Sequence, residues 1–149
     1  MTRLADRLLV AVVAAAALTG SLLPGCNCLV SHAEDQHTYK AAHARAIEQK
    51  KPLAVLVTAE WCPPCQRFKR HDLPRLKRDG VFDGVSLALV DIDKQPELAS
   101  KLANGKRGVP RFVIFYRRDD SSSWQRKTVT TVSRETVRRA IKDVIAENR

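Results

Sequence analysis

Two cysteines three residues apart, Cys62 and Cys65, follow a short apolar run at residues 53–57. Such a run is typical of a buried strand, and the residues after it can begin a helix. A thiolate at a helix N-terminus is stabilised by unpaired backbone N–H groups and by the positive end of the helix dipole, so it becomes a better nucleophile at working pH. The second cysteine, one turn further on, can attack a mixed disulfide formed on the first. The pattern predicts thiol–disulfide chemistry.

Hydrophobic periodicity predicts the elements that position these cysteines. Apolar and small residues at helical spacing predict a helix over 35–50, which Pro52 ends. Further helices are predicted from Cys62, over 96–103 and after Ser133, which can cap the last one. Pro74 must bend or restart the helix that begins at Cys62, because proline has no N–H to donate. Strands are predicted at 53–58, 85–90, 112–116 and 124–132.

This order of elements determines the expected architecture. A strand–helix–strand unit with a right-handed crossover gives two parallel strands, and the final hairpin adds two antiparallel ones. Helices are then available for both faces of the sheet. The predicted fold class is α/β, a three-layer α/β/α domain with a four-stranded mixed sheet.

Residues 1–33 are expected to lie outside this domain, which we place at 34–149. Arg3 and Arg7 precede a charge-free apolar run at 8–17, the pattern of an export signal. The run is too short for a comfortable membrane span, although an uncleaved membrane anchor is the alternative. We therefore predict export to the periplasm or cell envelope.

The sequence offers two cleavage sites. LPGC at residues 23–26 resembles a bacterial lipobox, in which Cys26 would be lipidated, although Pro24 is unusual there. SHA at residues 31–33 has the small residues that an ordinary signal peptidase requires, but it lies far from the apolar run. A lipid anchor at Cys26 and a soluble exported form both stay open. In either case Cys26 and Cys28 are interpreted as a processing feature, not as a metal or disulfide site.

The chain is strongly basic, with a formal net charge of +10. Such a charge suits nucleic acid or anionic lipid as partners. However, the charges are spread along the predicted helices, and few aromatic residues are available to stack on bases. A solvated basic surface is favoured, with no nucleic-acid partner and no cofactor.

Three segments, in order, resemble the thioredoxin superfamily from about Gln36 to the end of the chain. AEWCPPC at 59–65 resembles the active-site turn, and DIDKQPELA at 91–99 resembles the stretch after the next strand. RGVPRFVIF at 107–115 resembles the segment that holds a cis-proline. A lone C-x-x-C pair also occurs in metal sites, but the three segments together imply a thioredoxin fold.

The resemblance implies roles for five residues. Cys62 matches the nucleophile and Cys65 the resolving cysteine. Pro110 matches the cis-proline that packs opposite the disulfide, and with Val109 it would offer backbone groups to an extended substrate strand. Trp61 matches the tryptophan beside the thiols, with plain packing as the alternative.

The sequence also departs from the family pattern. A buried acid and its lysine partner, on neighbouring strands of cytoplasmic thioredoxins, correspond here to Leu56 and Leu89. The absence of both charged residues is physically consistent, because burying the acid without its lysine partner would be costly in free energy. That acid shuttles the proton of the resolving thiol. Glu60 or His71 is an alternative shuttle, although each also fits a solvated surface position.

Pro63 and Pro64, between the cysteines, have no N–H to donate to the Cys62 thiolate. A less stabilised thiolate favours the disulfide, which gives a more reducing couple.

The leading hypothesis is an exported thiol–disulfide oxidoreductase that reduces protein disulfides and is recharged by a membrane or soluble thiol reductant. The same atoms could run in the oxidising direction. One alternative is a binding module with the same scaffold and a stable disulfide without turnover. Another is a metal carrier that uses Cys62, Cys65 and His71, for which Cu(I) is a better match than zinc.

Overall fold

A single mixed sheet forms the centre of the computed structural model, which describes residues 37–105, 108–118 and 123–148. Its strands are β1 (Leu53–Thr58), β2 (Ser86–Asp91), β3 (Arg111–Arg117) and β4 (Trp124–Val129), in the spatial order β2-β1-β3-β4. β1 pairs with β2 in parallel, and the other two pairings are antiparallel. The α/β class and the four-stranded mixed sheet are confirmed. The predicted signal at 1–33 and its boundary lie outside the described residues.

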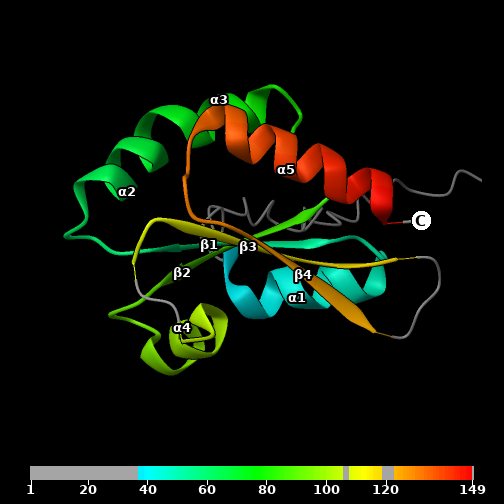
Figure 1. The fold of residues 1–149 in the computed structure, drawn as a ribbon, viewed down its shortest axis with the longest axis horizontal. Coiled ribbons are helices and arrows are strands. Elements are labelled where there is room, and N and C mark those ends of the chain that lie inside the picture. The colour runs from blue at the N-terminus through cyan, green and yellow to red at the C-terminus, as the bar shows by residue number, and fades with distance from the viewer. Residues whose placement is uncertain (1–36, 106–107, 119–122, 149) are drawn as a thin grey trace, which may run out of the picture.

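Helices cover both faces of the sheet (Figure 1). On one face lie α1 (Tyr39–Glu48) and α4 (Pro96–Ala103), and on the other lie α2 (Pro63–Arg67), α3 (Leu73–Arg78) and α5 (Arg134–Glu147). The predicted three layers are therefore present. In the described part of the chain, no helix combines the length and the apolar character needed to cross a membrane.

The central strand β1 is buried along its whole length, as its continuous apolar sequence predicts. Ala54 and Leu56 face the layer of α2, α3 and α5, whereas Val55 and Val57 face the layer of α1 and α4. This alternation follows from the period of two in a strand. β1 therefore holds the two layers together and ends directly before the cysteine segment.

The helix after the cysteines changes its pitch midway. Between α2 and α3, residues Phe68–Asp72 form one π-helical turn, and the N–H of Leu73 donates to the carbonyl of Phe68, five residues back. Pro74 has no N–H and its ring would clash with the carbonyl four residues earlier, so a wider turn before it relieves the conflict. The prediction that Pro74 alters this helix is confirmed. Phe68 is buried beneath it and packs edge-on against Phe112.

The last helix begins at a reciprocal cap. The N–H of Thr136 donates to Oγ of Ser133 over 3.2 Å, and the N–H of Ser133 donates to Oγ1 of Thr136 over 3.0 Å. The predicted Ser133 cap is confirmed, and Val137, Ala140, Ile141 and Val144 form the buried face. The apolar spacing of α5 and α1 also includes Ile145 and Ile47, but these side chains are 38% and 46% exposed. Both lie at the edge of an apolar stripe, where the neighbouring layer does not cover them.

Candidate active site

Cys62 and Cys65 form a disulfide at the point where β1 leads into α2, with an S–S distance of 2.20 Å. Cys62 is the N-cap of α2, and its Sγ accepts a hydrogen bond from the N–H of Cys65 over 3.2 Å. Cys62 is 3% exposed and Cys65 is 1% exposed. The structure therefore brings the two predicted cysteines together, with Cys65 the more deeply buried.

The start of α2 offers Cys62 few backbone donors. Pro63 and Pro64 occupy the first two helical positions and have no N–H. The N–H of Gln66 donates to the backbone carbonyl of Cys62 over 3.0 Å, so it is directed away from the sulfur. The N–H of Cys65 is the donor that reaches the Cys62 sulfur. This agrees with the expectation that the proline pair limits stabilisation of a thiolate there.

The peptide bond between Val109 and Pro110 is cis, as the resemblance implied, and Val109 lies against the disulfide. The carbonyl oxygen of Val109 is 3.7 Å from Sγ of Cys62. The Val109 side chain packs on the small cluster formed by the two cysteines and Ala59. Direct contact with a substrate strand remains a prediction for Val109 and Pro110.

Trp61 stands at the surface beside the disulfide, with 66% of its area exposed. Its Nε1 donates to Oδ2 of Asp93 over 2.8 Å. Asp93 is held in turn by its own N–H, which donates to Oδ1 of Asp91 over 3.0 Å. Such exposure argues against a packing role for Trp61. Asp93 was not among the predicted site residues, although it belongs to the segment 91–99 that resembles the family.

An open cavity of about 750 Å³ adjoins this site. Its lining includes residues of all three segments that resemble the thioredoxin family. Trp61 comes from 59–65, Ile92 and Pro96 come from 91–99, and Val109 and Arg111 come from 107–115. The fold thus brings the three segments together around one groove. Apolar side chains form most of its lining, together with Gly105, Gly108 and the buried Arg111.

The expected loss of the buried charged pair is visible in the sheet. Leu56 lies opposite Leu89 in the register of β1 and β2, and both belong to one apolar cluster. Among the described residues, the buried polar side chains are those of Thr58, Ser86 and Arg111, so none of them is a carboxylate.

Both alternative proton shuttles lie at the surface. Glu60 and His71 are both exposed, whereas Cys65 is buried. Oε1 of Glu60 lies 2.7 Å from Nζ of Lys94, and this hydrogen bond lowers the pKa of Glu60. Glu60 is therefore a paired surface carboxylate.

The metal-carrier alternative needs three ligands close together. Within residues 37–105, 108–118 and 123–148, no group of three or more His, Cys, Asp and Glu side chains is placed to hold a metal ion. His71 lines a surface pocket and does not join Cys62 and Cys65.

Fold and site together define a thioredoxin-fold protein with a paired C-x-x-C motif. A family model described as thioredoxin-like matches residues 34–117, and the chain belongs to this family. The fold and the Cys62–Cys65 pair at disulfide distance support a redox role. Comparison with curated proteins gives no match.

Solved thioredoxin structures share this fold. The Thermus thermophilus thioredoxin is 20% identical, with a TM-score of 0.62 over 75% of this chain and 87% of that one. The Fasciola hepatica thioredoxin is 20% identical, with a TM-score of 0.54 over 73% and 96%. The Trichomonas vaginalis thioredoxin is 22% identical, with a TM-score of 0.54 over 71% and 90%. At these identities the likeness concerns the fold.

Proposed function

We propose that this protein is an exported thiol–disulfide oxidoreductase that reduces disulfide bonds in other proteins. The observation that carries the proposal is the position of the Cys62–Cys65 pair. The Cys62 sulfur caps α2 and lies 3.7 Å from the carbonyl oxygen of Val109, at a groove that is open to solvent. A disulfide with only a structural role would need no such groove.

The reaction follows from this geometry. The Cys62 thiolate attacks one sulfur of the substrate disulfide, and the other sulfur leaves as a thiolate that takes up a proton. Cys65, whose Cα is 5.2 Å from that of Cys62, then attacks the Cys62 sulfur and releases the second substrate thiol. Two electrons pass from the protein dithiol to the substrate, and the Cys62–Cys65 disulfide remains.

The substrate is proposed to lie along Val109 and Pro110 as an added strand. Backbone groups of this edge would bind the substrate main chain, and the groove beside Trp61 would receive its side chains. Backbone contacts of this kind tolerate many sequences, which suits a protein that acts on several disulfides.

The reducing direction is supported by the two prolines at the start of α2, because they leave the Cys62 sulfur with few donors. Each turnover oxidises the protein, so a membrane-bound or soluble thiol reductant must recharge it. Export is supported by the basic and apolar pattern of residues 1–33. We place the protein in the periplasm or cell envelope, with lipidation at Cys26 as the anchored alternative.

Disulfide reduction can be tested with insulin as the substrate and dithiothreitol as the electron source. The wild-type chain is expected to accelerate insulin reduction, and a Cys62→Ser variant should lose the acceleration because the nucleophile is absent. Equal rates for the two proteins would favour a binding module without turnover.

Replacing Pro64 with His should make the couple more oxidising. The histidine restores one N–H at the second position of α2 and, when protonated, adds a positive charge, and both favour the thiolate over the disulfide. Each effect is worth about 1 kcal/mol, so the reduction potential should rise by about 40 mV. The measurement is a glutathione redox titration of both proteins, together with thiolate absorbance against pH.

A matched control is Pro63→Ala, which restores an N–H without adding charge and should produce a smaller rise. If the potential of Pro64→His is unchanged or falls, the proline pair does not control the couple. The reducing direction would then lose its main physical support.

A further inference from the structure

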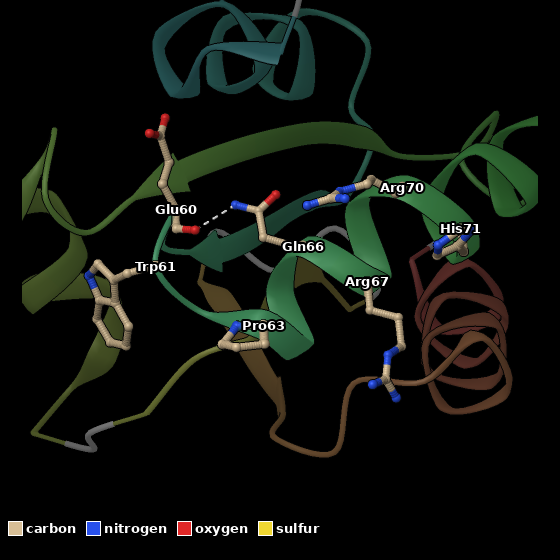
Figure 2. Close-up of a pocket in the computed structure, with 7 residues that line it drawn as sticks. All are labelled: Glu60, Trp61, Pro63, Gln66, Arg67, Arg70 and His71. Atoms are coloured by element: carbon tan, nitrogen blue, oxygen red, sulfur yellow. Dashed lines mark hydrogen bonds between the residues drawn. The ribbon is translucent and has the colours of Figure 1, made fainter.

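A second pocket, of about 400 Å³, adjoins the cysteine turn and runs along the exposed side of the following helix (Figure 2). Trp61 and Pro63 line it at the turn, and Arg67, Arg70 and His71 line it along the helix. These three helical residues have the spacing of one helix face. We call Arg67, Arg70 and His71 the basic face.

The charges of the basic face are not neutralised within the described part of the chain. Neither guanidinium, of Arg67 or of Arg70, has an ion-pair partner there. Glu60 also lines the pocket, but its carboxylate is paired with Lys94. Figure 2 shows that carboxylate directed away from Gln66, whereas the Glu60 backbone carbonyl accepts from Nε2 of Gln66 over 2.8 Å. The field in the pocket is therefore positive.

The chain beside these two arginines adds positive charge. Residues 66–71 contain Lys69 as well as Arg67 and Arg70, and no acidic residue. Guanidinium groups stay charged at any physiological pH and bind carboxylates in a bidentate manner. A pocket of this kind, open to solvent and next to a reactive sulfur, favours a ligand with several carboxylates.

We propose that the basic face recognises an acidic segment next to the disulfide of the protein substrate. The inference rests on the proposed disulfide exchange, because the ligand must place a sulfur at Cys62 while its acidic residues contact Arg67 and Arg70. A membrane surface could also supply negative charge. The acidic segment is favoured because the pocket shares Trp61 and Pro63 with the cysteine turn, so its occupant lies at the reactive site.

The test uses the full chain, reduced beforehand, and three synthetic disulfide-bonded peptides. The peptides are identical except for three flanking Glu, Gln or Lys residues. In the exchange, the peptide disulfide gains two electrons and two protons, and the Cys62–Cys65 dithiol loses them. At low ionic strength we expect a rate constant about tenfold higher for the Glu peptide than for the Gln peptide, with the ratio falling as salt is added.

The charge-reversal variant Arg67→Glu/Arg70→Glu should lose this preference or turn it toward the Lys peptide. The matched control is Arg75→Glu/Arg78→Glu, which makes the same charge change on α3 at exposed residues that do not line the pocket. At physiological salt the control should keep more of the Glu-to-Gln ratio than Arg67→Glu/Arg70→Glu does, because Arg75 and Arg78 do not line the pocket and exposed charges outside it are better screened. If the reversal does not fold, as judged by circular dichroism, Arg67→Gln/Arg70→Gln replaces it and should reduce the ratio.

Four outcomes would overturn the inference. The first is a wild-type protein without preference, and the second is an equal loss of preference in both double variants, which would mean a general charge effect. The third is loss of binding to phosphatidylglycerol vesicles in Arg67→Glu/Arg70→Glu with an unchanged peptide ratio, which would assign the face to a membrane. The fourth is failure of wild type to reduce any of the peptides, which would refute the proposed function as well.

Discussion

A Cys65→Ser variant is expected to accumulate mixed disulfides between Cys62 and substrate proteins. The first attack needs only Cys62, which caps α2 beside the open groove. The second attack needs Cys65, and an external thiol replaces it poorly because the intramolecular thiol has a high effective concentration. We expect turnover to fall at least about 100-fold and covalent complexes to persist.

The complexes can be detected on non-reducing gels and identified by mass spectrometry. Cys62→Ser is the matched control and should capture nothing, because the remaining thiol of Cys65 is 1% exposed in the native fold. If Cys65→Ser captures no partner while Cys62 still reacts with a small thiol reagent, the binding-module alternative is favoured over turnover.

Replacing Leu56 with Asp should strongly destabilise the fold at neutral pH. Leu56 is 1% exposed and lies opposite Leu89, so the new carboxyl would be buried without a cation. Burial raises the pKa of such a carboxyl above its unfolded value of about 3.9. We expect the free energy of unfolding to fall by about 4 kcal/mol or more at pH 7.

The pH dependence has a definite sign. Below about pH 3 the carboxyl introduced by Leu56→Asp is neutral in both states, so only the lost apolar contacts count. As pH rises toward the folded-state pKa, the unfolded chain ionises first, and stability falls until both states are charged.

The measurement is denaturant unfolding between pH 4 and 8, with Leu56→Asn as the control that loses similar contacts and does not titrate. The two variants should diverge as pH rises. Adding Leu89→Lys to Leu56→Asp should recover part of the loss by supplying a neighbouring cation. A pH-independent difference between the Asp and Asn variants would mean that position 56 is not where the family places its buried acid.

Local patterns were enough to predict most of the fold. The continuous apolar run at 53–58 was enough to predict β1, because a strand that is buried on both faces needs apolar residues along its whole length. The helix Pro96–Ala103 was predicted with its observed bounds. The cap at Ser133 was predicted because capping depends on a few adjacent residues. Strand ends were less accurate: β4 ends at Val129 and not at residue 132, since strand length depends on pairing with β3.

The remaining features depend on contacts between distant parts of the chain. Pro74 predicts a disturbed helix, but the π turn at Phe68–Asp72 depends on how Phe68 is held in the core. The Trp61–Asp93 hydrogen bond joins residues 32 positions apart. The helical spacing of Arg67, Arg70 and His71 could be seen in the sequence. The ion pair between Glu60 and Lys94 could not be seen there, because these residues are far apart in the chain.

The most direct test of the proposed function is the reduction potential of the Cys62–Cys65 couple, measured on protein lacking residues 1–33. In that shortened protein these two cysteines are the only ones. A redox titration against glutathione or dithiothreitol is predicted to show one reversible two-electron transition at a potential more negative than about −200 mV. A potential near about −120 mV would contradict the reducing direction. A disulfide that exchanges with neither reagent would contradict the redox role itself.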